Sequence, residues 1–123
     1  MDIDLPDGLK VVKVSKKLIL PNLLVTKIMP IKKAVSITVQ GKVQGVGFRY
    51  FVKSNAKRLN LVGFVKNQKD GSLYGEIIGN EDNIKKLIAL CYKGPLLSQI
   101  VEVKVKDIKL FEATQFVILK WLV

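Results

Sequence analysis

The sequence contains no histidine and only one cysteine, Cys91, among its 123 residues. Without histidine, the chain cannot build the Ser–His or Cys–His pairs of many hydrolases, a histidine general base or a histidine metal ligand. A single cysteine also excludes a disulfide within the chain. Any catalysis by this protein must therefore use other groups.

Long apolar runs are also missing from the N-terminal region. Its longest apolar interval, Leu18–Val25, contains a proline and an asparagine, and it is far shorter than the ~20 residues that a membrane-spanning helix needs. Asp2, Asp4 and Asp7 stand where a signal peptide would carry basic residues, and no small-residue cleavage site follows the apolar interval. We therefore expect a soluble, cytoplasmic protein that does not contact a membrane.

Acidic residues are scarce, because 10 Asp and Glu oppose 21 Lys and Arg, which gives a net charge of +11. Such a balance can attract nucleic acid or a small phosphate-bearing ligand, or it can reflect solvated surface lysines alone. The positive charges are spread over the chain, with no block of five or six like charges and no evident basic stripe. From charge alone we expect no nucleic-acid partner.

The length and the 49% hydrophobic content suit one folded domain with a modest core. We assign residues 34–123 to this domain and residues 1–33, which follow no regular pattern, to an N-terminal extension. Two interpretations of the extension stay open. Either Met29 is the true start and residues 1–28 are not native, or the extra segment is real and is partly disordered or packs on the domain.

From residue 34 onward the sequence alternates between strand and helix patterns. Alternating or short apolar segments predict strands at 34–40, 61–67, 72–79, 99–108 and 115–121. Apolar residues at helical spacing predict helices at 48–60 and 81–93, and Cys91 falls on the buried stripe of the second. This β-α-β-β-α-β order with an extra short C-terminal strand predicts a ferredoxin-like α/β sandwich of the α+β class, with two helices on one face of an antiparallel sheet.

The stretch GKVQGVGFRYF, Gly41–Phe51, joins the first predicted strand to the first predicted helix. A glycine-rich loop at such a junction presents unpaired backbone N–H groups, and the first helical turn adds free donors and a positive dipole end. Together these groups favour an anion. Arg49 lies in that first turn, off the buried stripe, where its guanidinium can fork onto two phosphate oxygens.

This loop has neither of the common phosphate-binding motifs, since it lacks a Gly-Lys-Ser/Thr ending and a third glycine three residues after Gly47. By itself it fits a tight turn followed by a surface arginine equally well. Asn67 ends the second predicted strand, just before the turn Gln68–Gly71, and can be a turn-side hydrogen bonder. In the predicted topology, however, that strand end comes near the first loop, so Arg49 and Asn67 can face one pocket.

The segments VQGKVQGVGFRYFV, GFVKNQKDGS and YKGP occur in an order that resembles the acylphosphatase family, over about Ala34–Leu119. The resemblance implies a small hydrolase that splits acyl phosphates into a carboxylate and inorganic phosphate, without metal or cofactor. It also implies that Arg49 and the loop bind the phosphate and that Asn67 orients the attacking water. The loop positions, which act through their backbone N–H groups, are Val43, Gln44, Gly45, Val46, Gly47 and Phe48.

The missing histidine is consistent with this chemistry. A carboxylate leaves readily, because its acid has a pKa of about 4, so the leaving group needs no general acid. Phosphoryl transfer mainly needs positioning and charge stabilisation, to which a well-aimed donor contributes ~3 kcal/mol. Because the Asn67 amide is a poor base, we expect the proton of the water to pass to the substrate phosphate.

Other functions on the same fold stay open. RNA-binding domains of this fold class stack bases on aromatic side chains of their central strands, and here Phe64 and Tyr74 lie on predicted strands. However, only Gly-Phe-Val of the RNA-binding motif is present, and we expect Phe64 to pack in the core. A second alternative is a module that binds or channels carbamoyl phosphate, as in the larger carbamoyltransferase proteins of hydrogenase maturation. Those proteins carry cysteine-rich zinc segments, whereas this chain has one cysteine. An inactive family member is disfavoured by Arg49 and Asn67. We expect a monomer, although long edge strands leave pairing open.

Overall fold

The computed structural model describes residues 32–120, so the predicted N-terminal extension lies almost entirely outside the described residues. The strands are β1 (Lys32–Lys42), β2 (Val62–Asn67), β3 (Leu73–Asn80), β4 (Gln99–Asp107) and β5 (Phe116–Ile118). The helices are α2 (Phe48–Arg58) and α3 (Glu81–Lys93). This order confirms the predicted one, although β1 begins at Lys32, two residues before the expected domain boundary.

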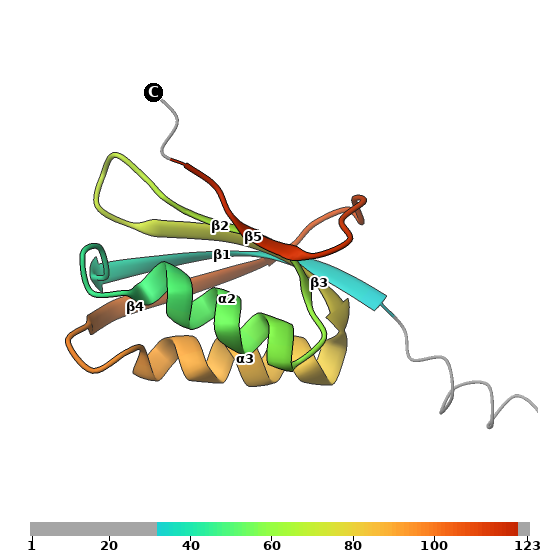
Figure 1. Ribbon diagram of the computed structural model, residues 1–123, viewed down its shortest axis with the longest axis horizontal. Helices are drawn as coiled ribbons and strands as arrows, with labels where there is room; N and C mark the ends of the chain where they lie inside the picture. The colour runs from blue at the N-terminus through green and yellow to red at the C-terminus, as the bar shows by residue number, and fades with distance from the viewer. Residues whose placement is uncertain (1–31, 121–123) are drawn as a thin grey trace, which may run out of the picture. The chain divides into compact units, whose positions relative to one another are not determined.

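The strands form one sheet in the order β4-β1-β3-β2-β5. β1 runs antiparallel to β3 and β4, and β2 runs antiparallel to β3, as expected. β5 instead runs parallel to β2, so the sheet is mixed rather than wholly antiparallel. Both helices cover the same face of the sheet, α2 against β2 and β5 and α3 against β3 and β4 (Figure 1).

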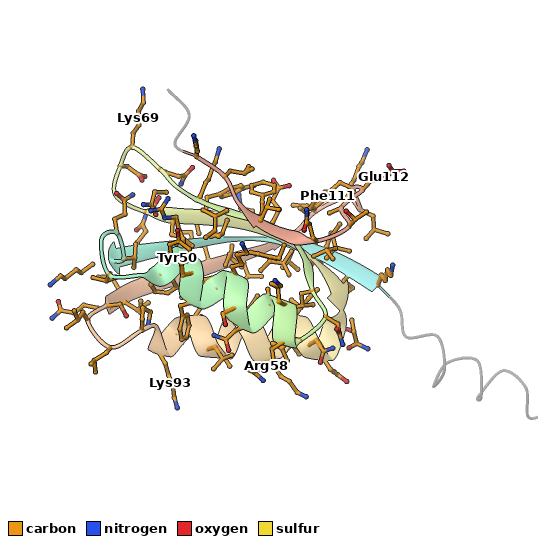
Figure 2. All side chains as sticks on the ribbon, viewed as in Figure 1. Tyr50, Arg58, Lys69, Lys93, Phe111 and Glu112 are labelled. Atoms are coloured by element: carbon orange, nitrogen blue, oxygen red, sulfur yellow. The ribbon has the colours of Figure 1, made fainter. Side chains whose placement is uncertain are left out.

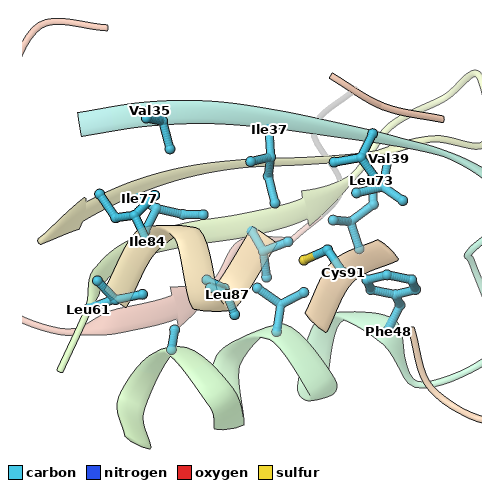
Figure 3. Packing of buried hydrophobic residues seen from close by; sticks show 14 of the residues in the cluster. Val35, Ile37, Val39, Phe48, Leu61, Leu73, Ile77, Ile84, Leu87 and Cys91 are labelled. Atoms are coloured by element: carbon cyan, nitrogen blue, oxygen red, sulfur yellow. The ribbon is translucent and has the colours of Figure 1, made fainter. Parts of the chain in front are cut away.

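The hydrophobic core fills the space between the helices and the sheet (Figure 3). Alternate residues of β1 and β3 point into it, and so do residues at every third or fourth position of the helices. The main contributors are Val35, Ile37, Val39, Leu73, Ile77, Phe48, Val52, Ala56, Ile84, Leu87 and Cys91. Burial raises the pKa of the Cys91 thiol to about 12, so this residue acts as a small hydrophobe rather than as a nucleophile.

The face of the sheet opposite the helices carries aromatic and charged side chains. Phe64 lies here and not in the core, with its ring centroid 6.2 Å from that of Tyr74 and 6.4 Å from that of Phe111. Phe111 comes from the segment between β4 and β5 and is labelled in Figure 2. The neighbouring Val65 enters the core instead. The expectation for Phe64 was wrong because the whole run around it is apolar, so its alternation did not indicate which face was buried.

Neither α2 nor α3, the two helices of residues 32–120, is long and apolar enough to cross a membrane.

Candidate active site

The glycine-rich loop and the turn between β2 and β3 lie at the same end of the sheet (Figure 1). The loop is anchored at both ends by the core, since Val43 and Phe48 are each only 1% exposed. The Phe48 ring also packs edge-on against Phe51, with the centroids 5.7 Å apart. The residues between these anchors are therefore held in place by two side chains of the core.

Gly45 and Gly47 give the loop its shape. Their φ angles are +74° and +78°, in the left-handed region that costs other residues steric strain. A Cβ atom at either position would meet nothing within 4 Å. Backbone conformation rather than crowding therefore requires glycine here, and the space in front of the loop is open to a ligand.

The backbone N–H groups of residues 44–48 donate no hydrogen bond to any acceptor within residues 32–120. The first helical bond runs from the Phe51 N–H to the Gly47 carbonyl, at 3.0 Å. The first turn of α2 also carries no acidic residue. Free donors and the positive end of the helix dipole thus coincide, which is the electrostatic setting that binds an anion.

Arg49 follows the buried Phe48 in the first turn of α2 and is partly exposed. No Asp or Glu of residues 32–120 lies within ion-pair distance of its guanidinium. The guanidinium therefore keeps its forked set of donors for an oxyanion.

Asn67 is the last residue of β2 and pairs with Leu73, which in turn pairs with Val39 of β1. Its side-chain oxygen Oδ1 is buried and has no hydrogen-bond partner among the described residues. A buried acceptor without a partner costs about 1–3 kcal/mol, and native proteins keep such atoms where a water or ligand satisfies them. Oδ1 of Asn67 is therefore an acceptor that no donor of residues 32–120 satisfies.

Gln44 has a role that the sequence did not indicate. Its side-chain Nε2 donates to the backbone carbonyls of Gln68, at 2.7 Å, and Ser72, at 3.0 Å. These carbonyls belong to the turn that directly follows Asn67, and this turn is closed by the Gln68 N–H donating to the Ser72 carbonyl at 2.8 Å. The Gln44 side chain thus ties the glycine-rich loop to the segment that carries Asn67.

The turn is also stiffened from within. The hydroxyl of Ser72, at 2.6 Å, and its backbone N–H, at 2.9 Å, both donate to the carboxylate of Asp70. These bonds hold the pKa of Asp70 below its ordinary value. The carboxylate therefore stays ionised and bonded within the turn, and it is not free to act as a base.

A Gln44→Ala variant should lower kcat by about 10- to 100-fold for the acyl phosphate hydrolysis that the sequence resemblance implies, because small displacements of positioned groups have effects of this size. We expect it to lose about 1–2 kcal/mol of unfolding free energy as well, since two turn carbonyls lose their donor. Steady-state kinetics and denaturant unfolding measure the two effects. Gln40→Ala, which removes a glutamine of β1, is the matched control. A Gln44→Ala variant with wild-type kcat would show that the tie is not needed.

The structure brings the predicted loop residues Val43 to Phe48, together with Arg49, to the same end of the sheet as Asn67, and Gln44 connects the two parts. Within the described residues, no group of three or more His, Cys, Asp or Glu is placed to hold a metal ion.

Comparison with known proteins bears on the same residues. The family model described as Acylphosphatase matches residues 35–118. A protein of Archaeoglobus fulgidus named acylphosphatase is 42% identical over 82 residues, which cover 65% of this chain and 92% of that protein. The crystal structure of acylphosphatase from Bacillus subtilis is 32% identical, with a TM-score of 0.69 over 72% of this chain and 99% of that one.

A larger protein contains a similar part. The crystal structure of full-length HypF in the phosphate- and nucleotide-bound form is 38% identical, with a TM-score of 0.71, over 76% of this chain but only 13% of HypF. The family model spans more than half of this chain, and the match to Bacillus subtilis acylphosphatase spans nearly all of that smaller protein. The chain therefore belongs to the acylphosphatase family.

Proposed function

We propose that this chain hydrolyses small acyl phosphates through Arg49, the loop amides of residues 43–48 and Asn67. The observation that carries the proposal is the buried Oδ1 of Asn67, which has no partner within the described residues. Free loop N–H groups lie at the same end of the sheet. One part can hold the phosphate and the other a water molecule, which is the pair of tasks that hydrolysis of a carboxyl phosphate requires.

In the proposed reaction, the oxygens of the transferred phosphoryl group accept hydrogen bonds from the loop amides and from Arg49. The water held by Asn67 Oδ1 attacks the phosphorus in line with the acyl oxygen. The bond between phosphorus and the acyl oxygen breaks, and its electron pair leaves on the carboxylate. One proton of the water passes to a phosphate oxygen, so the products are a carboxylate and inorganic phosphate.

The test is the hydrolysis of benzoyl phosphate by the full chain in the presence of EDTA. We expect turnover well above the uncatalysed rate and no loss on adding the chelator. A rate equal to the background would overturn the proposal. Carbamoyl phosphate is the second substrate to assay, because the family resemblance of the sequence left a carbamoyl-phosphate-handling module as the alternative to a general acylphosphatase.

The proposed proton transfer predicts a specific pH dependence. The phosphate dianion is the better proton acceptor, so kcat/KM should fall as the pH is lowered through the second ionisation of the substrate phosphate. Initial rates with benzoyl phosphate across this range measure the effect, and the uncatalysed rate at each pH is the control. A flat profile would contradict transfer to the substrate and would require a different acceptor.

The cytoplasmic location and the absence of a nucleic-acid partner stay predictions from the sequence. A salt-sensitive complex with RNA at physiological ionic strength would contradict the second of them.

A further inference from the structure

The segment between α3 and β4 contains a turn that exposes two leucines. The backbone N–H of Ser98, at 3.0 Å, and its hydroxyl, at 2.6 Å, both donate to the Pro95 carbonyl and so close a turn around Leu96 and Leu97. Leu96 is 96% exposed and Leu97 is 67% exposed. Exposed apolar side chains that stand singly need no explanation, but these two are neighbours that a closed turn presents together. We call residues 95–98 the leucine turn.

The leucine turn lies beside the glycine-rich loop. Gly94 directly precedes the turn, and a Cβ atom at this position would lie 3.0 Å from Cε2 of the Phe48 ring. Gln99 directly follows the turn and pairs with Lys42, the last residue of β1. Because Lys42 and Phe48 border the loop, each end of the leucine turn is held next to one end of the loop.

The leucine turn and Asn67 lie on opposite sides of the loop. In the sheet, β4 is on one side of β1, whereas β3 and β2 are on the other. The loop continues from β1, so the turn that follows Asn67 is on one side of it and the segment that leads into β4 is on the other (Figure 1). On the Asn67 side the loop is tied by the Gln44 side chain, and on the β4 side Phe48 meets Gly94.

The geometry of phosphoryl transfer gives this arrangement a direction. The attacking and leaving oxygens lie roughly in line, on opposite sides of the phosphorus. If the water is held on the Asn67 side of the loop, the acyl oxygen and the acyl group behind it point to the other side, where Leu96 and Leu97 lie. Leucine side chains offer neither charge nor hydrogen bonds, so they gain free energy by covering apolar surface.

We propose that Leu96 and Leu97 contact the acyl group of the substrate and make the chain prefer acyl phosphates with a larger apolar acyl group over acetyl phosphate. This inference rests on the proposed function, because it requires the phosphate on the loop and the water at Asn67. The two leucines determine specificity and take no part in breaking the bond to phosphorus. Because both are largely exposed, substituting them should change substrate preference and leave the fold intact.

The experiment compares the hydrolysis of butyryl phosphate and acetyl phosphate by the full chain. Both release simple alkanoates, so the two substrates differ in apolar surface and hardly in reactivity. A fully buried methylene group can raise kcat/KM by about fourfold, so two partly buried ones should make wild-type kcat/KM about fivefold higher for butyryl phosphate. Leu96→Ser and Leu97→Ser should each lower this ratio, and the double serine variant should bring it below about twofold. Leu96→Met/Leu97→Met should keep the wild-type ratio, because methionine is apolar and of similar size.

Leu110→Ser is the matched control, because Leu110 is 61% exposed but follows β4 at the end of the sheet away from the loop. It should keep the wild-type ratio, and a thermal unfolding midpoint close to that of wild type should show that each variant is folded. Equal kcat/KM for the two substrates in wild type, or an unchanged ratio in the double serine variant, would overturn this inference and leave the proposed function standing. No turnover of either substrate by wild type would overturn both.

Discussion

An Arg49→Ala variant should hydrolyse benzoyl phosphate with a kcat/KM at least about 10³-fold below that of wild type. Removing one hydrogen-bond donor that stabilises a developing oxyanion lowers kcat by about 10²- to 10³-fold. An arginine that contacts a transferring phosphoryl group raises kcat by about 10³- to 10⁵-fold. Both kcat and the affinity for phosphate should fall, because the guanidinium binds the ground state and the transition state. Arg49→Lys should recover only part of the loss, since lysine keeps the charge without the fork.

The matched control for Arg49 lies on the same helix. Arg58 is at the far end of α2 from Tyr50, the neighbour of Arg49 (Figure 2), and its guanidinium donates to Asn55 at 2.8 Å. Arg58→Ala removes the same charge without touching the loop and should keep wild-type kinetics. An Arg49→Ala variant that retains its fold and keeps kcat/KM within about tenfold of wild type would contradict this prediction. It would show that the loop amides are sufficient without the arginine.

An Asn67→Ala variant should lose about 10²-fold in kcat, with little change in the inhibition constant of inorganic phosphate. In the proposed reaction the buried Oδ1 of Asn67 acts on the water and not on the phosphate, so its removal should misplace the nucleophile and leave the anion site intact. This variant should not be less stable than wild type by more than about 1 kcal/mol, because it deletes an acceptor that has no partner among residues 32–120. Stopped assays, phosphate inhibition and denaturant unfolding give the three values.

The comparison of phosphate inhibition separates the two roles. Arg49→Ala should weaken inhibition by inorganic phosphate, whereas Asn67→Ala should not. Asn83→Ala, in the first turn of α3, is a control for the loss of an asparagine side chain. Equal weakening of phosphate binding in Arg49→Ala and Asn67→Ala would place Asn67 on the phosphate and contradict its assignment to the water.

The sequence predicted those parts of the structure that depend on local rules. Asn80 stands directly before the predicted helix 81–93, where asparagine is a preferred cap, and its side-chain oxygen accepts from the Asp82 N–H at 2.7 Å. The turn after Asn67 was expected from its Asp-Gly pair, and the helix stripes from their periodicity. The positions of Arg49 and Asn67 at one end of the sheet followed from the same elements once their order was known.

The parts that the sequence did not predict depend on partners far along the chain. Gln44 bonds to carbonyls 24 and 28 residues away, which come within reach only when β1, β2 and β3 are assembled. No periodicity marks such a residue, because its acceptors are backbone atoms that every sequence has. The parallel direction of β5 likewise depends on how the segment after β4 crosses the sheet, and no pattern within residues 115–121 indicates this direction.

The buried Cys91 thiol also allows local opening of the domain to be measured by chemical labelling. A water-soluble thiol reagent cannot reach this sulfur while α3 lies on the sheet, and the chain has no other cysteine to give a background signal. The rate of labelling under native conditions therefore measures how often α3 lifts away or the domain unfolds. Because a ligand that binds only the closed form must slow this labelling, phosphate occupancy of the loop can be followed without any assay of hydrolysis.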